Sequence, residues 1–108
     1  MMNYDELNPI HVANGWRESG IECALATVIN TWGSSPRPIG SQMVINVNGN
    51  FSGSVSGGCI ETSVVSEALE VIKFKKSKML EYNVTNKSAW DVGLTCGGRV
   101  NVYLEPIE

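Results

Sequence analysis

The sequence has few basic residues and no long apolar run, and each shortage excludes a class of protein. Eight Lys and Arg residues against eleven Asp and Glu residues give a formal net charge of −3. This balance argues against a nucleic-acid-binding surface, because such surfaces are basic. No apolar run approaches the roughly 18 residues of a membrane-spanning helix, and the first residues, MMNYDELNP, lack the basic and apolar regions of a signal peptide. We therefore expect a cytoplasmic protein with no nucleic-acid or membrane partner.

Cysteine and histidine are also scarce, which argues against a disulfide framework and against a zinc site. Cys23, Cys59 and Cys96 are odd in number and form no C-x-x-C pair. A zinc site made of Cys and His alone would need all three cysteines and His11 to converge. We instead expect His11 on the surface of a short helix and Cys23 in the core. The G-x-G-x-x-G and P-loop motifs and a Ser-His-Asp set are absent, so we assign no catalytic residue.

The local patterns that are present predict one small α/β domain. Asn8-Pro9 and Ser19-Gly20 are typical of the start and end of an N-terminal helix. Asn48-Gly49 predicts a type I′ turn and therefore a β-hairpin. We expect a mixed sheet of about five strands, at residues 22–32, 42–47, 50–55, 79–84 and 99–104.

One main helix is predicted after the sequence SVSGGC. Apolar residues from Ile60 to Ile72 recur at helical spacing and form a single stripe, and Lys73 follows the last turn. Glu61, Glu67 and Glu70 mark the side that we expect to face solvent. The sequence therefore predicts an amphipathic helix packed on the sheet.

Glycine is the residue in excess, at about half again its usual share, and most of the eleven glycines fall in three short loops. In the loop at 54–59, small residues leave backbone N–H groups bare at a helix N-terminus, which predicts an anion site. The same position lowers the pKa of a thiol such as that of Cys59. The alternative is that Gly57 and Gly58 only form a tight turn and that Cys59 is a small buried residue.

The other two glycine loops carry arginine, cysteine and hydroxyl groups. The loop GSSPRPIGS at 33–41 presents Arg37 on a stiff Pro-x-Pro segment, and arginine suits bidentate contact with phosphate or carboxylate groups. The loop at 95–98 places Cys96 beside Gly-Gly and is followed by Arg99. If the main helix and the last strand are neighbours, Cys59 and Cys96 could coordinate a soft metal, relay sulfur or form a redox pair. The alternative is that Cys96 packs under the sheet edge.

Three stretches together resemble the N-terminal domain of the xanthine dehydrogenase accessory factor family, XdhC/CoxI. They are ATVINTWGSSPRPIGSQM at 26–43, FSGSVSGGCIE at 51–61 and DVGLTCGGRVNVYLEP at 91–106. The resemblance implies a maturation chaperone without turnover chemistry of its own. Such a protein binds molybdenum cofactor as cargo and helps to insert it into a molybdenum hydroxylase of the xanthine dehydrogenase or carbon monoxide dehydrogenase type.

The resemblance also implies which residues contact the cofactor. Cys59 and Cys96 would be transient molybdenum ligands or sulfur carriers, and Glu61 would either cap free N–H groups or bind a partner. The implied cofactor-binding residues are Ser34, Ser35, Arg37, Gly57, Gly58, Cys59, Cys96, Gly97, Gly98 and Arg99.

The resemblance implies partners as well, because members of the family commonly carry a second, Rossmann-like domain. We expect residues 1–108 to form the first domain alone, with a separate Rossmann-domain protein as a candidate partner beside the hydroxylase apo-enzyme. A cysteine desulfurase and a second copy of the chain are further candidates. Two other functions stay open: a thiol-dependent sulfur-carrier domain that uses Cys59 and Cys96, and a structural subunit docked on a Rossmann-domain partner.

Overall fold

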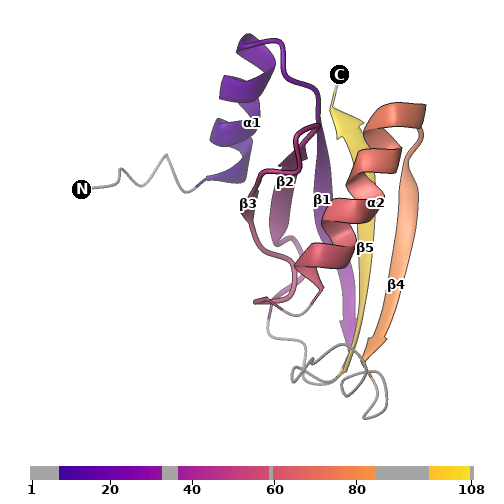
Figure 1. Ribbon diagram of the computed structural model, residues 1–108. Helices are drawn as coiled ribbons and strands as arrows, with labels where there is room; N and C mark the ends of the chain where they lie inside the picture. The colour runs from indigo at the N-terminus through magenta and orange to yellow at the C-terminus, as the bar shows by residue number, and fades with distance from the viewer. Residues whose placement is uncertain (1–7, 33–36, 59, 85–97, 108) are drawn as a thin grey trace.

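The computed structural model describes residues 8–32, 37–58, 60–84 and 98–107. In Figure 1 helix α2 lies across one face of a twisted sheet, and helix α1 stands beside β2 and β3. Two helices and five strands confirm the predicted small α/β domain. In chain order the elements are α1 (Pro9–Glu18), β1 (Cys23–Trp32), β2 (Gln42–Asn46), β3 (Phe51–Gly53), α2 (Glu61–Phe74), β4 (Lys78–Val84) and β5 (Gly98–Ile107).

The sheet is antiparallel throughout its described strands, where we expected a mixed sheet. Its order is β3-β2-β1-β5-β4, and each of the four neighbouring pairs is antiparallel. The connection through α2 does join two strands that run in the same direction. However, β3 and β4 lie at opposite edges of the sheet with three strands between them, so the crossover creates no parallel pair.

The predicted hairpin between β2 and β3 is present, but the predicted turn type is wrong. A type I′ turn needs positive φ at both central residues, and only Gly49 has it, at +87°. The side chain of Asn46 decides the turn: it is 1% exposed, and its Oδ1 accepts the N–H groups of Asn48 at 2.9 Å and Asn50 at 3.1 Å. The Asn46 carbonyl also accepts the Gly49 N–H at 2.9 Å. The turn therefore spans one residue more than predicted, and both strands are shorter.

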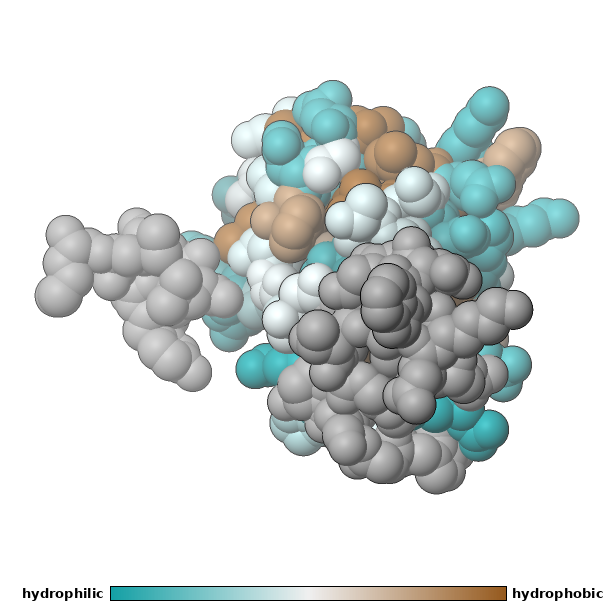
Figure 2. Space-filling view, turned by 60° about the horizontal axis from the view of Figure 1, so that its bottom comes forward, coloured by the Kyte–Doolittle hydropathy of each residue, from teal (hydrophilic) through white to brown (hydrophobic). Residues whose placement is uncertain are grey.

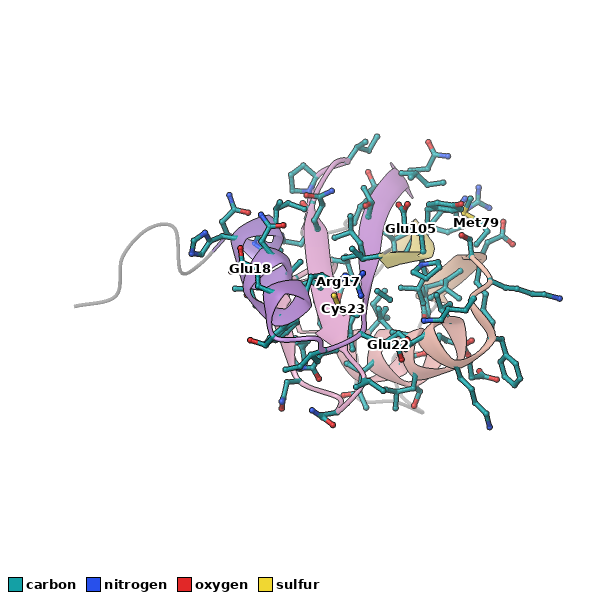
Figure 3. The ribbon with its side chains drawn as sticks, turned by 90° about the horizontal axis from the view of Figure 1, so that it is seen from above. Arg17, Glu18, Glu22, Cys23, Met79 and Glu105 are labelled. Carbon is teal, nitrogen blue, oxygen red and sulfur yellow. The ribbon has the colours of Figure 1, made fainter. Side chains whose placement is uncertain are left out.

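The two faces of the sheet are covered by different helices. Alternation along β2 sends Met43 and Ile45 into the main core beneath α2, and Val44 into a smaller cluster beneath α1. Cys23 is 1% exposed in that smaller cluster, which confirms its predicted packing role, and burial raises the pKa of its thiol. Figure 3 shows Cys23 close to Arg17, whose charge acts on this pKa in the opposite direction.

One end of the molecule, at the bottom of Figure 1, gathers segments that are far apart in sequence. The end of β1, the start of β2, residues 54–58, the start of α2, the end of β4 and the start of β5 all lie there. Pairing of Trp32 with Arg99 and of Val84 with Gly98 fixes the strand ends in register. Neither helix in the described part of the chain reaches the length and apolarity that crossing a bilayer requires.

Candidate functional site

The loop before α2 is organised by one carboxylate. Glu61, the first residue of α2, is 8% exposed, and its side chain turns back toward residues 54–58. Oε2 accepts the Ser54 hydroxyl at 2.7 Å and the backbone N–H groups of Val55 and Ser56 at 3.0 Å each. Oε1 accepts the Ser56 hydroxyl at 2.5 Å and the Gly58 N–H at 3.0 Å. Five hydrogen bonds therefore attach the loop to the helix.

The two serines extend this network into a second layer. Ser54 Oγ accepts the Gly57 N–H at 2.8 Å, and Ser56 Oγ accepts the Ile60 N–H at 2.9 Å. Each hydroxyl thus donates to Glu61 and accepts from the backbone. We name residues 54–58, held in this way, the braced loop.

The pKa of Glu61 reflects these contacts. Burial is the largest single influence and raises the pKa, because it removes water from the charged form. Hydrogen bonds from the hydroxyls of Ser56 and Ser54 and from the N–H groups of Ser56 and Val55 outweigh it and lower the pKa to about 2. Glu61 is therefore ionised throughout the physiological range, and the carboxylate form is the one that holds the braced loop.

The sequence suggested bare N–H groups in this loop and an outward-facing Glu61, and both details differ in the structure. The N–H groups of Val55, Ser56 and Gly58 are donated to Glu61. The protein supplies an anion of its own where we had expected a ligand to bind. Glu61 does accept backbone N–H groups, but from the loop that precedes α2.

Gly57 and Gly58 give the braced loop its exposed surface. Both have positive φ, at +73° and +109°, and both are exposed. A Cβ added at Gly58 would meet no atom within 4 Å, so there is open space above the backbone. The loop therefore presents bare main chain next to Cys59 in the sequence, where a bulky group can approach closely.

Arg37 lies at a separate feature, a cavity of about 340 Å³ beside the braced loop. The cavity lies between the first turn of α1, the segment after Arg37 and the end of β3. Figure 2 brings the lower end of the molecule forward and shows mainly hydrophilic and intermediate residues around it, with apolar residues farther up. The lining residues are Asn8, Pro9, Arg37, Gly40, Ser41, Gln42, Gly53 and Ser54.

Backbone contacts fix the walls of this cavity. Gly40 donates to the Val28 carbonyl at 2.8 Å, and Val28 donates to the Ser41 carbonyl at 2.9 Å, which attaches the Arg37 segment to β1. On the opposite wall, a Cβ at Gly53 would lie 2.3 Å from the Gln42 carbonyl oxygen and 2.6 Å from Pro9 Cγ. Only glycine fits there, so α1 and β2 approach each other as closely as they do because residue 53 has no side chain.

The structure brings together some of the predicted site residues and separates others. Ser54, in the braced loop, also lines the cavity that holds Arg37. Arg99 lies next to Trp32 in the sheet and is exposed on the face opposite the α2 core, since the adjacent Val100 belongs to that core. Outside the described residues lie Ser34, Ser35, Cys59, Cys96 and Gly97.

The metal expectations can be tested only in part. His11 is exposed on α1, as predicted. Within the described ranges, no group of three or more His, Cys, Asp and Glu residues could hold a metal ion. The hypotheses about Cys59 and Cys96 as molybdenum ligands lie outside those ranges.

The residues that complete the two features are not predictable from the sequence in the same way. Asn8 is predictable as a helix cap, and its Oδ1 does accept the Ile10 N–H at 2.9 Å, but nothing local indicates that it faces Arg37. Ser41 and Gln42 fit the start of a strand and carry no further signal. For the braced loop a signal does exist: two serines, one residue apart, precede a helix whose first residue is glutamate.

Comparison with known proteins gives a consistent result. Residues 16–83 match the XdhC and CoxI family. The chain is 36% identical over 90 residues to the molybdenum cofactor insertion chaperone PaoD of Escherichia coli (strain K12), covering 82% of this chain and 28% of that protein. It is 30% identical over 88 residues to a probable xanthine dehydrogenase component of Bacillus subtilis (strain 168), covering 80% of this chain and 27% of that protein.

A solved structure shares the fold. A crystal structure described as a xanthine dehydrogenase from Bacillus halodurans superposes with a TM-score of 0.78 at 28% identity. The superposition covers 94% of this chain and 31% of that one. The chain thus spans less than a third of the length of each of these three proteins.

Proposed function

Because the chain belongs to the XdhC and CoxI family, we propose that it binds molybdenum cofactor as cargo and serves the maturation of a molybdenum hydroxylase. The apo-hydroxylase is the receiving partner in this proposal. Similarity to the insertion chaperone PaoD supports the identity of the cargo. A separate Rossmann-domain protein is proposed as a second partner, since the chain spans only part of its relatives.

The observation that carries the proposal is the braced loop. A cofactor chaperone must hold a reactive group firmly enough to protect it and release it without chemical change. Five hydrogen bonds to one ionised carboxylate keep the backbone of residues 54–58 in place before any cargo arrives. Ordering costs are thus met in folding, which favours binding. The exposed Gly57 and Gly58 leave room for a bulky metal centre next to residue 59 in the sequence.

The chemistry of the cargo fits the residue types in the three glycine loops. Molybdenum cofactor offers a soft metal–sulfur end and a phosphate end. In the proposal Cys59 and Cys96 hold the metal end, because thiolates are suitable ligands for soft metals. Ser34, Ser35, Gly97, Gly98 and Arg99 complete the surroundings of the cargo.

A protection assay tests this function. The purified chain is incubated anaerobically with molybdenum cofactor released from a molybdoenzyme, and the surviving cofactor is measured by reconstitution of an apo-hydroxylase. We expect the wild-type chain to prolong cofactor survival, and the Cys59→Ser/Cys96→Ser variant to lose most of that effect. Cys23→Ala is the matched control, because Cys23 is buried away from the braced loop.

Two results would contradict the proposal. Equal protection by the wild type and the double variant would remove the cysteines from the site. No protection by the wild type, together with a sulfur adduct on Cys59 or Cys96 after incubation with a cysteine desulfurase and cysteine, would favour a sulfur-carrier function instead.

A further inference from the structure

We propose that the cavity at the start of α1 is a phosphate subsite that binds the phosphate group of an organic phosphate monoester. The cavity and its donors carry this inference on their own. The further step, that this monoester is the phosphate end of the cargo, rests on the function proposed above.

Charge favours an anion in this cavity. Arg37 is the charged residue among those lining it, and none of the described lining residues is acidic. The braced loop next to it is different, since its donors already face the Glu61 carboxylate. An incoming anion therefore meets a cationic wall at Arg37 and finds the loop donors occupied. The positive end of the α1 dipole, capped by Asn8, adds to the same sign.

A buried donor also faces the cavity. Ser41 is only 9% exposed and lines the cavity, and its hydroxyl has no hydrogen-bond partner within the described part of the chain. Buried hydroxyl groups in folded proteins are nearly always paired. A ligand oxygen in the cavity would supply the acceptor that Ser41 lacks.

Two side-chain amides are oriented as further donors. The Oδ1 atom of Asn8 is engaged by the Ile10 N–H, so its NH₂ group is the part left for a ligand. The Gln42 NH₂ group makes one long contact, 3.5 Å to Thr27 Oγ1, and amides carry two donor hydrogens. Together with Arg37 and Ser41, these amides give four donor groups around one space.

Size selects the ligand class. Small-molecule sites typically measure about 300–1,000 Å³, and this cavity measures about 340 Å³. That volume holds a phosphate group together with part of the organic group that it esterifies. It is therefore larger than inorganic phosphate alone requires.

Titration monitored by ¹H–¹⁵N NMR tests the proposal. The probes are inorganic phosphate and phenyl phosphate, each compared with sodium chloride at equal ionic strength. We expect saturable shifts of the Gly40, Ser41 and Gly53 amides and of the Asn8 and Gln42 side-chain amides. Phenyl phosphate should bind more tightly than inorganic phosphate, because the cavity has room for the ester group.

Two variants make the test specific. Arg37→Gln should weaken phenyl phosphate binding about tenfold or more, as expected for loss of a charge-assisted contact. Its matched control is Arg17→Gln, which removes the same charge in the last turn of α1, about 13 Å along the helix from Asn8. Asn8→Asp keeps an N-cap acceptor but adds a carboxylate to the cavity. It should abolish binding while the far-UV circular dichroism spectrum stays unchanged.

The outcomes separate this inference from the proposed function. Shifts that do not saturate, or equal weakening by Arg37→Gln and Arg17→Gln, would overturn the phosphate subsite. If cofactor protection persists in the Asn8→Asp variant, the proposed function stands and the phosphate of the cargo binds elsewhere. If phenyl phosphate binds as predicted but the wild type gives no cofactor protection, the subsite stands and the proposed cargo is wrong.

Discussion

The starts of the two helices treat negative charge in opposite ways. At α2, the Glu61 carboxylate folds back and accepts three backbone N–H groups and two hydroxyls of the braced loop. At α1, Asn8 caps the helix with a neutral oxygen, and the adjacent cavity is lined by Arg37 and by polar donors. One helix start is satisfied by the protein itself, and the other faces a cavity whose described lining residues include no acid.

The difference teaches that a glycine-rich loop before a helix is not by itself an anion site. In the braced loop, glycine serves the tight turn and the bare outer surface, and the donors point inward. Around the cavity, the donors are side chains from three separate segments. The first arrangement suits firm presentation of a neighbouring thiol, and the second suits recognition of an anion.

Removing the carboxylate should break the braced loop and give the largest effect. Glu61→Ala leaves the buried N–H groups of Val55 and Ser56 without an acceptor, at about 1–3 kcal/mol for each group. We expect the free energy of unfolding to fall by about 3–5 kcal/mol in urea denaturation. Glu67→Ala, on the same helix, is the control: it loses only a partly exposed pair with Lys78 and should cost much less. Equal losses would contradict the bracing role.

Acid titration should sharpen the same contrast. The pKa of Glu61 is about 2 in the folded protein against 4.5 as its ordinary value. A lowered folded-state pKa adds stability that is complete above about pH 5 and lost as the pH falls toward 2, about 3 kcal/mol in all. Denaturation between about pH 6 and 2 should show this loss, and Glu61→Gln should flatten the curve. The same slope in both proteins would assign the acid sensitivity to other groups.

A methyl group at Gly53 should disturb the wall between the cavity and α1. Its Cβ would meet the Gln42 carbonyl oxygen at 2.3 Å and Pro9 Cγ at 2.6 Å, so Gly53→Ala should lower the melting temperature by an amount equivalent to about 3 kcal/mol. Gly49→Ala is matched in φ, at +87°, but has open space around it. It should cost about 1 kcal/mol. Similar melting temperatures for the two variants would show that the wall yields.

The smallest effect should come from the α1 cap. Asn8→Ala removes the acceptor of the Ile10 N–H and should cost about 1 kcal/mol in thermal unfolding. Asn8→Asp restores an acceptor and should be nearly neutral. An Asp variant as unstable as the Ala variant would mean that Asn8 stabilises the fold through its NH₂ group.

Much of the fold could be predicted because its signals are local. Asn8-Pro9 marks the start of α1, the apolar stripe from Ile60 to Ile72 marks α2, and alternation marks the last strand. The turn type could not be predicted because it depends on Asn46, whose buried side chain binds two turn N–H groups. The direction of the strand pairs could not be predicted because local patterns do not say which strands become neighbours.

The candidate site was less predictable for the same reason. The motifs containing Arg37, Gly57 and Gly58 were found from their residue types. The inward turn of Glu61 depends on its burial against the loop, and the same helical spacing also suits an exposed residue. The cavity joins Asn8, Arg37 and Gly53, whose contacts are tertiary and leave no periodic trace in the sequence.

Native mass spectrometry of the chain after anaerobic incubation with molybdenum cofactor tests most directly whether the chain binds this cargo. The cofactor should be presented at the same concentration to an apo-hydroxylase in a parallel sample. We predict a species carrying one cofactor per chain. Detection of the cofactor-free chain alone, while the apo-hydroxylase takes up the cofactor, would contradict the proposed function.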